Sequence, residues 1–132
     1  MNAFIVDLED RPGSLAAVAE ALAMKGISIT SLAGLVARGT GGAAILTNDE
    51  AGTRKALADA RMAVREVEVV PHAIEDRPGA FAEVARRLAD AGVNLEAVLP
   101  TGMSGGKVSI AFATNEAAKA REALGAMTTA GS

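Results

Sequence analysis

The strongest constraint on the fold of this chain is a short sequence that occurs twice. Asp-Arg-Pro-Gly at residues 10–13 recurs at residues 76–79, and Gly-Ile-Ser-Ile at 26–29 returns at the same offset as Gly-Val-Asn-Leu at 92–95. Self-similarity at a fixed spacing of this length is the signature of a repeated structural unit. The sequence therefore predicts two copies of one small unit, joined in tandem.

The length of the chain fits two such copies. Its 132 residues divide into a first unit at 1–67 and a second at 68–132. Units this small bury little surface on their own, so we expect them to pack on other surfaces. Half of the residues are hydrophobic but only 2% are aromatic, and Trp and Tyr are absent. The cores must therefore be built from Ala, Val, Leu and Ile.

Composition also excludes several classes of function. The formal charge is −3, with Lys and Arg scattered along the chain, which gives no basic surface for nucleic acid. The absence of Cys excludes disulfides, thiolate chemistry and cysteine-based zinc sites. No apolar run approaches the ~20 residues of a membrane span, and no signal sequence opens the chain. We expect a cytoplasmic protein that binds neither membrane nor nucleic acid.

Hydrophobic periodicity gives the order of elements in the first unit. Alternation of apolar residues indicates strands, and an apolar stripe at Leu15, Val18, Ala19 and Leu22 indicates a helix. The predicted order is β-α-β-β-α-β. Its ranges are a strand at Ala3–Glu9, a helix that ends at Gly26, strands at Ser28–Arg38 and Ala43–Thr47, a helix from Asn48 or Asp49 through Ala60, and a strand at Met62–Val70.

The second unit repeats this order with two departures. No linker precedes it, and Val64 and Val67 are out of phase, so we predict a bulge or break near Arg65–Glu66. After Leu124 the chain leaves no room for a full last strand. Pro71, which central strands avoid, lies in the strand that this missing strand would flank.

The repeated turn has a definite chemistry. Proline tolerates the first position of a helix, Asp10 can accept a hydrogen bond from a free amide beyond it, and Gly13 permits close approach to the backbone. The free amides, the helix dipole and the Arg11 guanidinium together outline a small-anion site. The alternative is a plain strand-to-helix turn in which aspartate is only a cap.

Other reactive residues do not assemble into a catalytic set. His72 is the single histidine and has neither a cysteine nor a carboxylate pair near it in sequence, so we expect a partly buried structural role or a pocket wall. The glycine clusters at 39–42 and 102–106 lack the Lys-Ser/Thr of a phosphate loop. We predict no enzyme activity, no metal site and no cofactor.

A strand, then Asp-Arg-Pro-Gly-x-Leu/Phe, an apolar helix, Gly and Ile-Ser-Ile or Val-Asn-Leu resembles the ACT domain, a small ferredoxin-like module. The resemblance implies an α+β fold of two ferredoxin-like βαββαβ units with antiparallel sheets. The second unit departs from the family because the residues after Leu124 leave no room for a full last strand. In that family the ligand, usually a free amino acid, lies where two domains meet. It is held by the loop after the first strand of one domain and by the second strand of the other.

The resemblance also implies ligand-binding residues in both units. In the first unit they are Asp10, Arg11, Pro12, Gly13, Ser14, Leu15 and Ser28. In the second they are Asp76, Arg77, Pro78, Gly79, Ala80, Phe81 and Asn94. Asparagine is frequent in the family at the position of Asn94, whereas Ser28 keeps a hydroxyl and loses the amide. We therefore expect two inequivalent sites, with the first unit the weaker.

These observations predict a non-enzymatic sensor of a free amino acid that acts as an allosteric regulator of a partner enzyme. Because two small units leave sheet edges to cover, we also expect a homodimer. The alternative is a ligand-free interaction or assembly domain that keeps the same fold. Fold-level analogy does not by itself choose between them.

Overall fold

The computed structural model describes residues 1–125, which form a mixed α+β fold. Contacts between Cα atoms divide the chain into two compact units, Met1–Val67 and the remainder from Glu68. The described elements are β1 (Asn2–Glu9), α1 (Ser14–Ala23), β2 (Ile29–Ala37), β3 (Thr40–Thr47), α2 (Glu50–Asp59), β4 (Val64–Glu75), α3 (Ala80–Asp90), β5 (Ala97–Ser104), β6 (Lys107–Ala113) and α4 (Ala117–Gly125).

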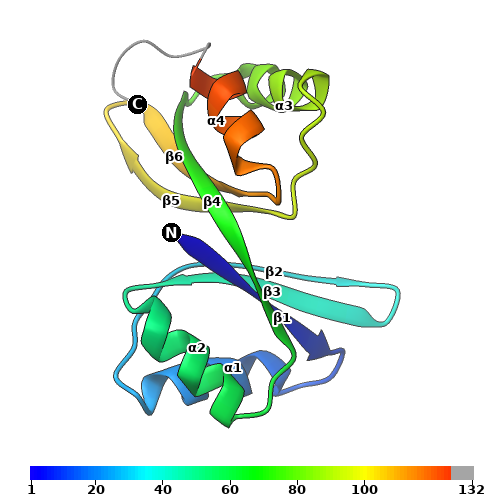
Figure 1. The fold of residues 1–132 in the computed structure, drawn as a ribbon, viewed down its shortest axis with the longest axis vertical. Helices are drawn as coiled ribbons and strands as arrows, with labels where there is room; N and C mark the ends of the chain where they lie inside the picture. The colour runs from blue at the N-terminus through cyan, green and yellow to red at the C-terminus, as the bar shows by residue number, and fades with distance from the viewer. Residues whose placement is uncertain (126–132) are drawn as a thin grey trace. The chain divides into compact units, whose positions relative to one another are not determined.

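The first unit is a four-stranded sheet with two helices on one face (Figure 1). Its strand order is β2-β3-β1-β4, and β3 pairs antiparallel with both β1 and β2. Phe4, Ile45, Leu22 and Leu57 are fully buried between sheet and helices. This order and the βαββαβ sequence of elements define a ferredoxin-like unit, so the predicted fold class is confirmed.

The second unit repeats the arrangement with strands in the order β4-β6-β5. Here β6 pairs antiparallel with β4 and β5, and α3 and α4 cover one face of the sheet (Figure 1). Val70, Leu88, Phe112 and Leu124 form the centre of its core. The prediction that this unit lacks a full last strand concerns residues after Gly125, which lie outside the described part of the chain.

The predicted break near Arg65–Glu66 is wrong, because β4 runs without interruption from Val64 to Glu75. Val64 packs against the core of the first unit, whereas Val67 is buried on the opposite face of the strand. The two valines are thus out of phase because both faces of β4 carry apolar residues. A pattern that assumes one buried face cannot distinguish this arrangement from a bulge.

The predicted helix ends are confirmed. Gly26 has φ of 70°, and its N–H donates to the carbonyl of Ala23. The N–H of Ile27 donates to the carbonyl of Leu22. Gly92 has φ of 76° and its N–H bonds in the same way to the carbonyl of Ala89. This pattern is the Schellman motif, which favours glycine because its φ is positive. Within residues 1–125, no helix is long and apolar enough to cross a membrane.

Candidate functional site

The repeated Asp-Arg-Pro-Gly sequence forms the same turn in both units. The N–H of Ser14 donates to the carbonyl of Arg11 at 3.4 Å, and Gly13 between them has φ of 92° and ψ of −12°. In the second unit Ala80 and Arg77 make the matching bond at 3.2 Å. Proline at the second position and a left-handed residue at the third define a type II turn. The glycine is therefore required by its positive φ.

The predicted capping by Asp10 is wrong. α1 begins at Ser14, its N-cap is Gly13, and no side chain bonds to the first helical amides. The left-handed backbone of Gly13 interrupts the helical path, so Pro12 lies before the helix and Asp10 is too far back to cap it. The loop is closed instead by Ser14, whose hydroxyl donates to the carbonyl of Glu9 at 2.7 Å.

Two amides remain available at this helix start. Ala17 N–H bonds back to the carbonyl of Gly13, but within residues 1–125 the N–H groups of Leu15 and Ala16 have no hydrogen-bond partner. Unpaired donors at a helix start carry partial positive charge from the helix dipole. The first turn of α1 can therefore donate to an anion.

A hollow of about 400 Å³ opens beside this helix start, between the loop and β2. It is called the Arg11 hollow below. Its charged lining residues come from the end of β1 and the loop, and β2 contributes aliphatic ones. Its lining consists of Leu8, Glu9, Asp10, Arg11, Ser14, Leu15, Leu32, Gly34, Leu35, Val36 and Gly42. It thus brings together four of the residues expected from sequence, Asp10, Arg11, Ser14 and Leu15.

Among residues 1–125, the Arg11 side chain makes one ion pair, and that pair is exposed. Its Nε donates to Oε2 of Glu9 at 2.7 Å, and the two side chains are 63% and 76% exposed. Ion pairs this exposed contribute little because water and salt screen them. The guanidinium can therefore exchange Glu9 for another anion at small cost.

The remaining predicted residues of the first unit lie elsewhere. Pro12 and Gly13 are exposed in the loop and do not line the Arg11 hollow. Ser28 does not line it either: its N–H bonds to Oδ1 of Asn48 at 3.0 Å, and its carbonyl accepts the N–H of Asn48 at 3.1 Å. Ser28 therefore connects the end of α1 to the start of α2, and within its own unit it is not part of the hollow.

The hollow contains residues of β2 that sequence reasoning missed. Leu32 lies opposite Ile45 in β3, and Ile45 lies opposite the core residue Phe4. Directly paired residues share a face of the sheet, so Leu32, Gly34 and Val36 face the side that carries the helices. The available signal was the run of aliphatic residues in a strand whose neighbours could not be assigned from sequence.

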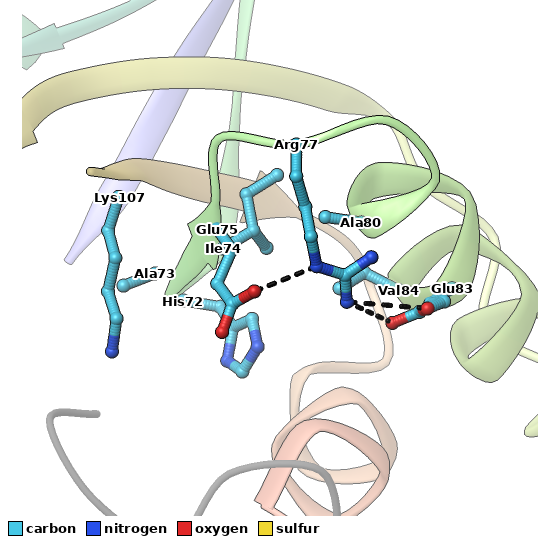
Figure 2. A pocket seen from close by; sticks show the side chains of 9 residues that line it. All are labelled: His72, Ala73, Ile74, Glu75, Arg77, Ala80, Glu83, Val84 and Lys107. Atoms are coloured by element: carbon cyan, nitrogen blue, oxygen red, sulfur yellow. Dashed lines mark hydrogen bonds and ion pairs between the residues drawn. The ribbon is translucent and has the colours of Figure 1, made fainter.

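A pocket also adjoins the loop of the second unit, shown in Figure 2. A pocket of about 170 Å³ there, the His72 pocket, lies beside β4 and α3. Arg77 Nε donates to Glu75 at 2.7 Å, and its Nη2 lies 3.1 Å from Glu83. Hydrogen bonds from Arg77 to Glu75 and then Glu83 raise the pKa of the guanidinium. Since Ala17 stands where Glu83 would be, Arg11 has no second carboxylate of this kind.

His72 confirms the predicted pocket wall. Its side chain lies among the lining residues in Figure 2, and only 8% of the residue is exposed. Burial lowers the pKa of the imidazole, so the ring is neutral at pH 7. Of the expected site residues of this unit, Arg77 and Ala80 line the His72 pocket. Lys107 also lines it, opposite Glu75 in the pairing of β4 with β6.

The other expected residues of the second unit are dispersed. Asp76, Pro78 and Gly79 are exposed in the loop. Phe81 is 42% exposed and stacks on Phe112 with ring centroids 6.3 Å apart. Asn94 donates from Nδ2 to Glu96 at 3.5 Å, away from the pocket. Among residues 1–125, no group of His, Cys, Asp and Glu side chains is arranged to hold a metal ion.

Comparison with known proteins identifies the family. The model of the ACT domain matches residues 3–69, half of the chain, so the chain belongs to the ACT domain family. Similarity to solved structures covers more of it. A protein from Bacteroides thetaiotaomicron is 25% identical with a TM-score of 0.78, over 96% of this chain and 87% of that one.

Two further solved structures share the fold. The regulatory subunit of aspartate kinase from Thermus thermophilus is 18% identical with a TM-score of 0.65, over 97% of this chain and 91% of that one. The regulatory subunit of aspartate kinase from Thermus flavus is 21% identical with a TM-score of 0.65, over 95% and 91%. The comparison with curated proteins finds no match.

Proposed function

We propose that this protein is a non-enzymatic sensor that binds a free amino acid in the Arg11 hollow and regulates a partner enzyme. The observation that carries the proposal is that Leu15, whose N–H is unpaired, lines a hollow of about 400 Å³ together with one cation, Arg11, and two carboxylates, Glu9 and Asp10. This volume lies in the range of small-molecule sites. No group of residues around the hollow forms a nucleophile–base pair, which favours binding over catalysis.

The charged lining residues of the hollow suit the two charges of an α-amino acid. The amides of Leu15 and Ala16 and the guanidinium of Arg11 are donors for the carboxylate. The carboxylates of Asp10 and Glu9, which also line the hollow, are acceptors for the ammonium group. When a ligand carboxylate takes the guanidinium, Glu9 is released from Arg11 and becomes available to the ammonium group.

The proposal extends to the organisation of the chain. We propose that 1–67 and 68–132 are two ACT units in tandem, that the protein is a cytoplasmic homodimer, and that its target is an enzyme of amino-acid metabolism. The aspartate kinase subunits with the same fold are named regulatory, which supports the last point. The second unit remains a second proposed site, formed by residues 76–81 and Asn94. Placing the main site in the first unit departs from the expectation from sequence that the first unit binds more weakly, and it rests on the larger, partly aliphatic hollow beside Arg11.

Calorimetric titration of the full chain with each common amino acid tests the proposal. We expect one or a few of them to bind. Arg11→Ala should weaken binding by about tenfold or more, because a hydrogen bond to a charged group contributes about 1.5–3 kcal/mol. Arg77→Ala is the matched control from the repeat. Equal losses of affinity in the two variants would mean that the second unit contributes equally to binding. No binding by any amino acid would refute the proposal.

The alternative function is a ligand-free assembly domain. One observation favours it: Leu15, Leu32, Leu35 and Val36 are among the exposed large hydrophobic residues of the described chain, and all four line the Arg11 hollow. Exposed apolar patches of this kind also mark protein–protein contacts. A dimer that persists unchanged with and without every amino acid would favour this reading.

A further inference from the structure

The Arg11 hollow has two kinds of lining residue. The end of β1 and the loop contribute the charged residues of the lining, whereas the lining residues of β2 are Leu32, Gly34, Leu35 and Val36, none of which has a charged or hydrogen-bonding side chain. Val36 is 54% exposed and Leu32 40% exposed, values high enough that a ligand lying against them would remove apolar surface from water.

One glycine leaves room above β2 on the helix side of the sheet. Gly34 lines the hollow between Leu32 and Val36 on that face. A Cβ at Gly34 would meet only the carbonyl of Gly42, at 3.8 Å, so the space over β2 is open. The absence of side chains lets a ligand lie directly on the backbone of the hairpin.

The second unit has different residues at these places. Gly34 pairs with Ala43, and the corresponding pair in the second unit is Pro100 with Ile110. A proline ring thus stands where the first unit has no side chain. The open aliphatic surface over β2 is therefore a property of the first unit.

We infer that the ligand of the first unit is an α-amino acid with an aliphatic side chain of the size of leucine, isoleucine or methionine. This inference rests on the proposed function, since it takes the charged lining residues as the site of the carboxylate and ammonium groups. The side chain then extends over Gly34 toward Leu32 and Val36. A lysine or aspartate side chain placed there would lose water without gaining a partner, which disfavours both.

Competition among amino acids tests the inference on the full chain. Leucine, isoleucine and methionine should bind at least about tenfold more tightly than glycine or alanine, because an apolar pocket discriminates by about tenfold or more for each methylene group that it contacts. Lysine, aspartate and threonine should bind more weakly than leucine. Preference for a charged or hydroxylated amino acid would overturn the inference and leave the proposed function standing. Absence of binding by every amino acid would overturn both.

Two variants locate the side chain of the ligand. Gly34→Val should weaken leucine binding by about tenfold and glycine binding much less, because it fills the space above β2. Val36→Asp should also weaken leucine binding, and its exposed position makes it harmless to folding. Met103→Ala, at a 70% exposed residue of β5, is the control and should leave affinity unchanged. Unchanged leucine affinity in Val36→Asp, with native circular dichroism, would overturn the inference.

Discussion

Replacing Gly13 by alanine isolates the cost of the left-handed residue in the repeated turn. An added Cβ at Gly13 would meet no heavy atom within 4 Å, so steric overlap contributes nothing. The φ of 92° alone opposes the substitution, at about 1–2 kcal/mol for a residue other than glycine. Loss of chain entropy in the unfolded state offsets about 0.4–1 kcal/mol of this. We expect a net destabilisation of about 1 kcal/mol.

Gly34→Ala is the matched control in the same unit. Gly34 does not have a positive φ, and its added Cβ would make one ordinary contact at 3.8 Å. This variant should be neutral or slightly stabilising, so the two variants should differ by about 1–2 kcal/mol. Urea unfolding followed by far-ultraviolet circular dichroism measures the difference, since the chain has no Trp for fluorescence. Equal unfolding free energies for the two variants would refute the assignment of a type II turn.

Three further predictions concern titration and exchange. Hydrogen bonds from Arg54 lower the pKa of Glu66 to about 2. The contribution of this carboxylate to the free energy of unfolding should therefore be complete above pH 4.5 and be lost as the pH drops toward 2. In urea titrations, Glu66→Gln should lower the free energy of unfolding at pH 7 and remove this pH dependence. Burial lowers the pKa of His72, so as the pH falls the unfolded chain is protonated before the folded one, and the free energy of unfolding should decline below pH 6.5. Nuclear magnetic resonance of this single histidine should show the lowered pKa, and an ordinary value would contradict its burial. The N–H of Ala73 points away from β6, so it should exchange with solvent much faster than that of Val70, which faces β6. Slow exchange would show that another strand covers this edge.

The expected Val70 exchange differs from that of Ala73 because alternate peptide groups of β4 face opposite edges. The carbonyl of Glu68 accepts a hydrogen bond from the N–H of Thr114, and the N–H of Asp76 donates to the carbonyl of Gly106. The backbone N–H and C=O groups of the even-numbered residues between them therefore point toward β6. In the first unit Asp7, the counterpart of Ala73, donates outward to the carbonyl of Ala63 at 3.0 Å. The repeat thus supplies an internal reference for a paired edge.

The order of elements and the places where helices end follow from the sequence because the interactions that decide them are local. Apolar spacing selects strand or helix, and Gly26 and Gly92 stop their helices because positive φ is easy only for glycine. The Asp-Arg-Pro-Gly turn is local too, but the sequence predicts a cap at Asp10 where the chain makes a type II turn. A helix cap and a type II turn favour nearly the same residues at these positions, and the positive φ of Gly13 identifies the turn.

The composition of the site was decided by the tertiary structure. Leu32, Gly34 and Val36 join Arg11 in one hollow because β2 and β1 both pair with β3, a contact between segments about 20 residues apart that no local pattern encodes. Sequence determines which side chains can bind a charge or an apolar group. Strand pairing determines which of them meet, because register depends on the packing of the whole sheet.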